Sequence, residues 1–307
     1  MPLEFTINIY SQLIEALQQQ GFSFQPIGEF LEEPKEKIVI LRHDVDQVPY
    51  NSLKTAQKEN ELGIKGSYYF RTVPQSFDEK IIKEIYSLGH EVGYHYEDVS
   101  MTANRQKAED RRRKEEKEED YEKYLAELAI KSFEENLTKF REIVPIKTIC
   151  MHGSPMSRWD SRLLWKYYDY KDFGIVGEPY FDINFDEVLY LTDTGRRWDG
   201  SAVSIRDKGL GIRNKESGEE GYKEWKVKPV SGSLMNMTSE SIDFHNKYRF
   251  RSTSQIISVA EKGELPDKIM ITFHPQRWTD KTVPWVKELV WQNMKNVGKY
   301  FLVKLRD

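Results

Sequence analysis

The first hundred residues alternate between short apolar runs and helical patterns, and this alternation constrains the fold more than any other feature of the chain. Runs typical of buried strands occupy residues 38–46, 66–73 and 91–97. Between them, residues 51–63 and 78–89 have helical spacing, and each segment ends at a glycine. Strands and helices in this order and at this spacing predict parallel βαβ units.

The same alternation continues towards the C-terminus. Further strands with their exit loops are expected at residues 146–155, 173–177, 187–195, 267–278 and 300–305, and helices at 162–168, 254–263 and 284–297. Seven or eight strands alternating with helices are typical of a TIM-type barrel. We therefore predict the α/β class, with an irregular (β/α) barrel of about seven parallel strands. A doubly wound open sheet is the alternative, and in both folds functional groups gather at the carboxyl ends of the strands.

We expect a single barrel domain over residues 1–307, with two additions to the regular pattern. One long helix is predicted at about residues 103–144. Its first part carries a run of mixed charges, which is typical of a solvated face. Residues 196–250 lack a regular pattern and predict an insertion, which we expect to form a wall over the strand ends on the substrate side. Its glycine-rich part, 208–221, is expected to be mobile without ligand.

Charge and composition exclude several classes of protein. The formal net charge of −4 gives no general attraction to nucleic acid or to anionic membranes. The single cysteine, Cys150, allows no intrachain disulfide. No apolar run approaches the roughly 20 residues of a membrane span, and the first residues lack the pattern of a signal peptide. We therefore expect a cytoplasmic protein without a membrane span or a nucleic-acid partner, and the sequence leaves its oligomeric state open.

Ionisable side chains gather at the predicted carboxyl ends of the strands. They are Asp44, Asp46, His95, Glu97, His152, Asp193 and His274. Residues two apart on a strand share a face, so Asp44 is expected beside Asp46, and His95 beside Glu97. Converging carboxylate and imidazole groups are what a divalent transition metal requires. The sequence therefore predicts one divalent ion held by Asp46 and His95, with His152 or Glu97 as a third ligand.

The other ionisable residues near the strands have structural interpretations. Arg42 shares the face of Asp44 one layer deeper, where it could hold that carboxylate ionised. His43 has the opposite parity and is expected in the layer between strand and helix. His90 follows a helix terminus and His245 lies in no motif, so both are expected to be structural.

Three motifs in this order, LRHDVD, GHEVGYH and TFHP, resemble the polysaccharide deacetylase family (NodB homology, carbohydrate esterase family 4). The similarity spans roughly residues 38–100 and 146–277. It implies a distorted (β/α) barrel of seven strands and a metal, often zinc, bound by one Asp and two His. It further implies Asp44 as catalytic base, Asp46 and His95 as metal ligands, and His274 as general acid.

The chain departs from the family pattern at three places. Val99 stands where the second metal histidine usually follows, so Glu97, Asp98, His152 or a water must fill that role. The sequence MHGSP replaces an Arg–Pro loop, and no clear acidic–Trp motif orients the acid histidine. The segment TDTGRRWDG offers Asp193 or Asp199 as the acidic member of such a motif.

Together these features predict a metal-dependent hydrolase that removes an acetyl group from an N-acetylated sugar, such as a nucleotide- or lipid-linked one. Arg196, Arg197 and Trp198 are candidate contacts to a phosphate and a sugar face. Two alternatives stay open. The enzyme could cut another C–N bond, as allantoinase-like relatives of the family do, or the chain could be a non-catalytic barrel that binds carbohydrate. A phosphoesterase would need more clustered His and Asp than the sequence contains.

Overall fold

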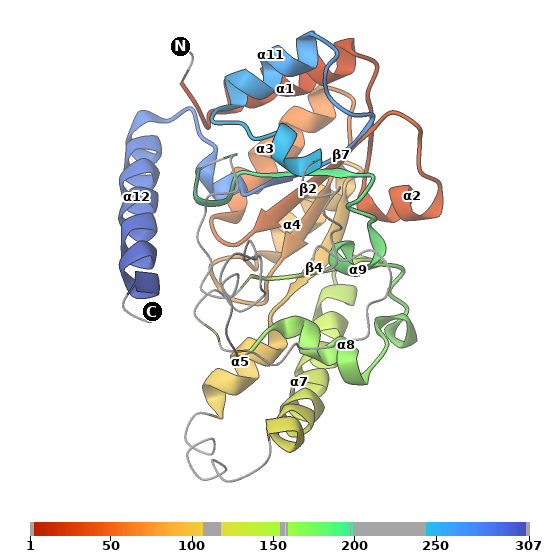
Figure 1. Cartoon of the computed structure of the whole chain (residues 1–307). Coiled ribbons are helices and arrows are strands. Elements are labelled where there is room, and N and C mark those ends of the chain that lie inside the picture. Colours follow the sequence, from red (N-terminus) through yellow and green to blue (C-terminus); the bar gives the residue numbers. More distant parts are fainter. Residues whose placement is uncertain are drawn as a thin grey trace, which may run out of the picture.

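A curved parallel sheet forms the centre of the computed structural model, which describes residues 3–106, 118–153, 157, 159–196, 198 and 244–304. In this part of the chain the strands are β1 (Ser23–Gln25), β2 (Ile38–Val45), β3 (Ser67–Phe70), β4 (Glu91–Tyr96), β5 (Ile149–Met151), β6 (Leu189–Thr192) and β7 (Lys268–Phe273). The strand pairs among these seven are all parallel. The sheet curls into a half-barrel with helices around it, which confirms the predicted α/β barrel-like architecture (Figure 1).

Strand β2 is the central strand of the sheet. The order is β5-β4-β3-β2-β7-β6, and β1 pairs with the first residues of β2. All eight residues of β2 are buried. Ile38 and Ile40 pack in the cluster on the inner face, whereas Val39 and Leu41 pack beneath the outer helices. Because neither face of β2 meets water, every charged side chain on it needs a partner inside the protein.

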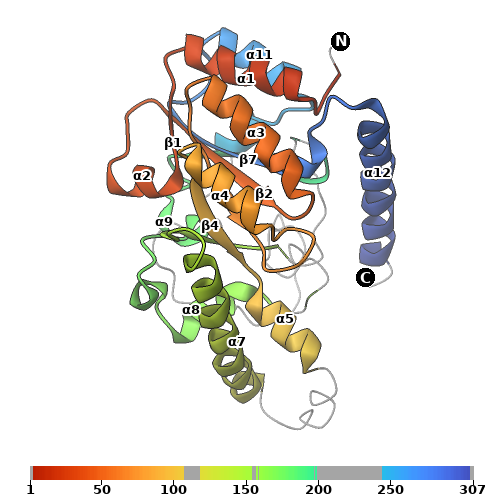
Figure 2. The same ribbon diagram turned by 180° about the vertical axis from the view of Figure 1, so that it is seen from behind.

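Two groups of helices cover the outer face of the sheet (Figures 1 and 2). Helices α1 (Ile7–Gln19) and α11 (Thr253–Glu261) lie side by side over β2, β6 and β7. Helices α3 (Pro49–Glu61), α4 (Glu79–Ser87) and α7 (Glu118–Arg141) pack against β3 and β4. The apolar stripe of α1, which includes Leu13 and Leu17, is fully buried in this layer.

Shorter elements and one isolated helix complete the described chain. They are α2 (Ile27–Glu32), α5 (Asp98–Arg105), α8 (Leu164–Tyr167), α9 (Pro179–Asp182), the 3₁₀ turns η1 (Ser161–Leu163), η2 (Tyr170–Phe173), η3 (Thr194–Arg196) and η5 (Pro275–Arg277), and α12 (Thr282–Lys304). Helix α12 stands along one side of the molecule in both views (Figures 1 and 2). None of the described helices combines the length and the apolar character that a membrane crossing needs.

Two of the predicted strands are wrong. At residues 173–177, Gly174 adopts a left-handed φ of 68° after the turn η2, and only Gly177 pairs with a neighbour, Thr148. The apolar run between the two glycines is too short to build a ladder. The second error is the strand predicted at residues 300–305, because α12 continues as a helix through Lys304. A short apolar run does not by itself distinguish a strand from a helix.

Other differences concern lengths and additions. The sequence did not predict β1, which is only three residues long. Within the helix predicted at about 103–144, the described part contains the end of α5 and all of α7 as given above, and residues 107–117 between them lie outside the described part. The described part also leaves out 197 and 199–243, so the predictions for the insertion and for its stretch 208–221 stay predictions.

A carboxylate buried behind β2 ties the helical layer to the sheet. Glu59 on α3 is fully buried, and its Oε1 lies 2.7 Å from Nε2 of His43. It also accepts hydrogen bonds from the hydroxyl of Tyr10 on α1 and, at 2.8 Å, from that of Tyr68 on β3. His43 stacks on Tyr68 with ring centroids 4.2 Å apart. This confirms that His43 points into the strand–helix layer, away from the inner face.

Removing this carboxylate should destabilise the fold. In Glu59→Ala the two tyrosine hydroxyls and the His43 imidazole lose their shared acceptor inside the core. We expect the free energy of unfolding to fall by about 3–5 kcal/mol, as is typical when one partner of a buried pair is removed. Urea unfolding followed by circular dichroism measures this loss. The control is Glu61→Ala, where the exposed ion pair with Lys58 should be worth less than about 1 kcal/mol. Equal stability of the two variants would contradict a structural role for Glu59.

Candidate metal centre

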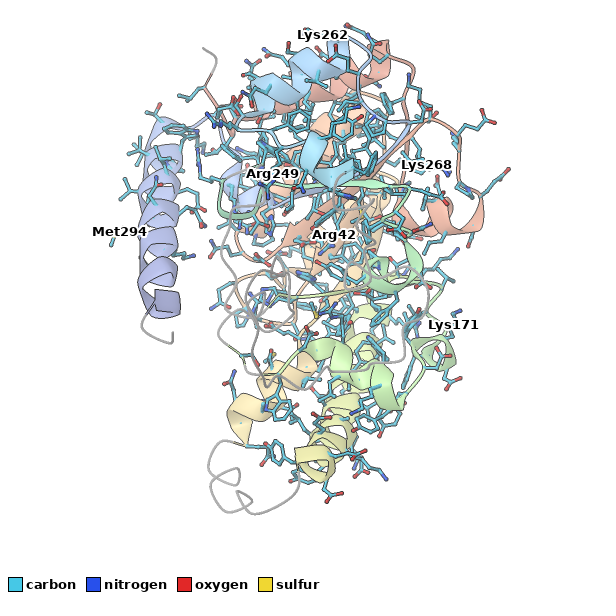
Figure 3. The ribbon with its side chains drawn as sticks, in the orientation of Figure 1. Arg42, Lys171, Arg249, Lys262, Lys268 and Met294 are labelled. Atoms are coloured by element: carbon cyan, nitrogen blue, oxygen red, sulfur yellow. The ribbon has the colours of Figure 1, made fainter. Side chains whose placement is uncertain are left out.

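The inner face of β2 carries a buried ion pair. Arg42 donates from Nε to Asp44 Oδ1 and from Nη2 to Asp44 Oδ2, both at 2.8 Å. Arg42 lies in the middle of the molecule (Figure 3), and its guanidinium also packs over the ring of Tyr180 on α9. Burial raises the pKa of Asp44, but the charges of Arg42, His95 and His274 and the Arg42 hydrogen bonds together lower it below its usual value. Asp44 is therefore ionised, and Arg42 already donates a hydrogen bond to each of its oxygens.

His95 on β4 presents one ring nitrogen to both aspartates. Its Nδ1 lies 2.9 Å from the carbonyl oxygen of Cys150 on β5. Because a carbonyl only accepts, Nδ1 carries the hydrogen and Nε2 keeps its lone pair. That Nε2 lies 3.7 Å from Asp46 Oδ1 and 3.8 Å from Asp44 Oδ2. Burial lowers the pKa of His95 to about 4, so the imidazole is neutral and suited to bind a metal.

His152 follows β5 and approaches the same aspartate oxygen. Its Nε2 lies 3.4 Å from Asp46 Oδ1, and its Nδ1 lies 3.0 Å from Glu97 Oε2. Burial lowers the pKa of His152, but the neighbouring carboxylates of Asp46 and Glu97 outweigh it and raise the pKa to about 9. Two carboxylates flanking one imidazole therefore favour a positive charge at this point. A bound cation would supply that charge and leave His152 neutral.

Glu97 fixes His152 from the outside. Its Oε1 accepts from Nε of Arg71 at 2.7 Å and lies 2.6 Å from Nη2 of the same guanidinium. Despite the desolvation, the His152 hydrogen bond and the Arg71 charge lower the pKa of Glu97 to about 2. Both of its oxygens are thus engaged away from Asp46. This geometry favours His152 over Glu97 as the third ligand.

The remaining candidate for that role faces elsewhere. Asp98 begins α5 and accepts hydrogen bonds from the Tyr94 hydroxyl and from Ser132 and Asn136 on α7. Val99, at the position of the usual second histidine, is fully buried in the core under α7. The helical start at residue 98 therefore turns both side chains away from the site.

His274 follows β7 and is held by Asp193, which two further side chains hold in turn. Its Nδ1 lies 2.5 Å from Asp193 Oδ1, and its backbone N–H donates to Asp193 Oδ2 at 3.0 Å. Asp193 also accepts from Arg277 at 2.8 Å and from the Trp278 indole at 2.6 Å. The opposite nitrogen, Nε2, lies 4.0 Å from Asp46 Oδ2. The structure thus pairs Asp193 with His274, and the tryptophan beside them is Trp278.

The donor set fits a divalent transition ion. Asp46, His95 and His152 each offer a ligand atom, and these atoms lie within 4.8 Å of one another. Asp46 Oδ1 is buried and has no hydrogen-bond partner in the described structure, although two imidazole Nε2 atoms face it. A buried carboxylate oxygen without a hydrogen-bond partner calls for an explanation, and a metal ion bound to Asp46 Oδ1 would supply one.

A second group of donors, formed by Asp44, His95 and Cys150, fits less well. Both oxygens of Asp44 already accept from Arg42. Burial raises the pKa of the Cys150 thiol well above its usual value, so the thiolate that binds metals is disfavoured. The metal position indicated by the geometry is therefore the one beside Asp46.

Of the residues predicted to contact substrate, the two that the structure describes are not brought to this site. Trp198 is 3% exposed, packs against Phe273 and Trp278, and donates from its indole to Thr253. It is a core residue in the described structure, and the sugar contact there stays a prediction. Arg196 packs over the rings of Phe5 and Trp285. Arg197 and Asp199 lie outside the described residues.

Three functional neighbours were missed from the sequence. Arg71 directly follows β3. An arginine at the end of a predicted strand was the signal available in the sequence. Trp278 stands four residues after His274 in HPQRW, close enough to suggest the aromatic partner. Gln276 donates from Nε2 to Asp46 Oδ2 at 3.3 Å, which leaves Oδ1 for an ion. No sequence rule identifies that last contact.

No family model, curated protein or solved structure matches this chain. The resemblance to deacetylases therefore rests on the three motifs, and any function must be argued from the geometry above.

Loss of the proposed ligands should abolish metal binding. We expect Asp46→Ala and His95→Ala to purify without a stoichiometric divalent ion, measured by elemental analysis. Glu97→Gln removes a charge that orients His152, so its metal affinity should fall by about 10–100-fold. The control is His274→Ala, whose imidazole lies outside the ligand group and which should keep its metal. Wild-type stoichiometry in both ligand variants would rule out this site.

Proposed function

We propose that this protein is a metal-dependent hydrolase that removes an acetyl group from an N-acetylated sugar. The observation that carries the proposal is that the residues around Asp46 fall into two groups, one able to hold an ion and one placed beside it. Asp46, His95 and His152 can hold an ion, while Asp44 and His274 stand beside them with other partners. A site used only to bind a metal would need neither the Arg42–Asp44 pair nor the clamp on His274.

The proposed ion is zinc, since one carboxylate and two imidazoles are common zinc ligands in catalytic sites that keep an open position. When bound, such an ion polarises the acyl oxygen and makes water a stronger acid. Its ligands would be the carboxylate of Asp46 and the Nε2 atoms of His95 and His152, because their Nδ1 atoms are engaged by Cys150 and Glu97.

Asp44 is proposed as the general base. Arg42 helps to lower the pKa of Asp44, so the carboxylate is ionised, and its two hydrogen bonds fix the plane of that carboxylate. Each oxygen retains a second lone pair, so the carboxylate can still take a proton from the attacking water. A buried carboxylate next to a cation is a weak base, but it needs no reorganisation during the reaction.

His274 is proposed as the general acid. With its Nδ1 hydrogen held by Asp193, its Nε2 can donate a proton to the amine as the C–N bond breaks. The charges of His274 and Arg277, together with the hydrogen bonds from His274, lower the pKa of Asp193 against the effect of burial. The ionised Asp193 would stabilise the imidazolium that donates this proton. The products would be acetate and an amino sugar.

Removal of the base or the acid should reduce the rate and spare the metal. We expect Asp44→Asn and His274→Ala to lose about 10²–10⁴-fold in turnover of N-acetyl sugars at unchanged metal content. Acetate release and elemental analysis of the same preparations measure both quantities. Asp186→Asn, an exposed carboxylate on a turn, serves as the matched control and should behave as wild type.

Four results would change the assignment. Full activity in either variant would exclude its catalytic role. Lost metal in Asp44→Asn would make Asp44 a ligand. Turnover of ureides in place of N-acetyl sugars would keep the metal site but replace the substrate class, and metal binding with no turnover at all would favour a carbohydrate-binding protein.

A further inference from the structure

Gln276 on the turn η5 reaches the candidate metal centre with its side-chain amide. The residue is 8% exposed, and its Nε2 donates to Asp46 Oδ2 at 3.3 Å. Because an ionised carboxylate only accepts hydrogen bonds, the NH₂ end of the amide must face Asp46 and the carbonyl end must point away from it. That carbonyl oxygen, Oε1, is buried and has no hydrogen-bond partner in the described structure. One buried acceptor of Gln276 is therefore left over.

The turn that carries Gln276 is anchored through the two residues that follow it. Arg277 and Trp278 donate from their side chains to Asp193 at 2.8 and 2.6 Å. The same carboxylate holds the imidazole of His274. The position of Gln276 is therefore set by the contacts that hold the proposed general acid.

His274 and Gln276 approach the same oxygen of Asp46. Nε2 of His274 lies 4.0 Å from Oδ2, and Nε2 of Gln276 lies 3.3 Å from it. The imidazoles of His95 and His152 face the other oxygen, Oδ1. A substrate nitrogen that takes its proton from His274 therefore approaches on the side of Asp46 where the Gln276 amide lies.

We propose, on the basis of the hydrolase proposed above, that Gln276 Oε1 accepts a hydrogen bond from the N–H of the scissile amide and so selects amides over esters. A secondary acetamide offers one N–H donor at this point, whereas an O-acetyl ester offers only acceptors. With an ester bound, the buried Oε1 stays unpaired, which disfavours the complex. Sites built around a buried polar group strongly reject analogues that lack the matching group. The substrate class is therefore N-acetylated sugars, to the exclusion of O-acetylated ones.

Acetate release from a matched pair of sugars tests this inference. The pair is methyl N-acetylglucosaminide and the methyl glucoside with an O-acetyl group on the same carbon. Gln276→Met replaces the amide by an apolar group of similar size. In this variant we expect kcat/KM for the amide to fall by about 10–100-fold relative to kcat/KM for the ester. Elemental analysis and thermal unfolding of the same preparations report bound metal and folding.

Gln292→Met is the matched control. Gln292 is also 8% exposed and also donates to a carboxylate, that of Glu288, but it lies on α12. Its amide-to-ester ratio should equal that of the wild type. If Gln276 only positions Asp46, Gln276→Met would lower both rates equally, and the unchanged ratio would overturn the inference while the hydrolase stands.

A binding measurement needs no substitution at Gln276. In zinc-loaded Asp44→Asn, where turnover is slow, titration calorimetry should show the amide binding at least about tenfold more tightly than the ester. Equal affinities, or no binding of either sugar, would overturn the inference. Failure of the wild type to release acetate from both sugars would refute the proposed hydrolase, and the same titration of the wild type would then decide the role of Gln276.

Discussion

The burial of β2 on both faces is the constraint on which the rest of the structure depends. The strand carries Arg42, His43 and Asp44 in succession, and none of them reaches water. Each charge must therefore be paired inside the protein, since an isolated buried charge costs several kcal/mol or more. On the inner face Arg42 pairs with Asp44, and on the outer face Glu59 lies beside His43. One strand thus links the helical layer to the candidate site.

The three imidazoles around Asp46 are oriented in the same way. In each of them, the ring nitrogen that points away from Asp46 contacts a carbonyl or carboxylate oxygen. A carbonyl holds His95, and the carboxylates of Glu97 and Asp193 hold His152 and His274. These contacts come from different strands and fix which nitrogen faces inward. Partners of this kind commonly set the tautomer and the position of metal-binding and catalytic histidines. The geometry of the site is therefore a property of the whole sheet edge.

The two proposals for this protein concern different parts of one site. The hydrolase rests on the strand ends, with their buried carboxylates and imidazoles. The preference for amides rests on Gln276, which lies on the turn after β7 and contacts the oxygen of Asp46 that the ligand imidazoles do not face. Because the ion and the selecting amide approach different oxygens of Asp46, the preference can fail while the metal site remains.

The sequence by itself determined the βαβ order, the place of the site at the strand ends and the parity that separates His43 from Asp44. These features follow from local periodicity, because alternate residues of a strand face opposite sides. It did not determine that residues 300–305 continue a helix, since apolar runs suit either element. Only the tertiary structure decided that His152 approaches Asp46, that Arg71 holds Glu97 and that Trp198 is core. Such contacts join strands far apart in the chain, and their distances depend on the curvature of the sheet, which no local pattern encodes.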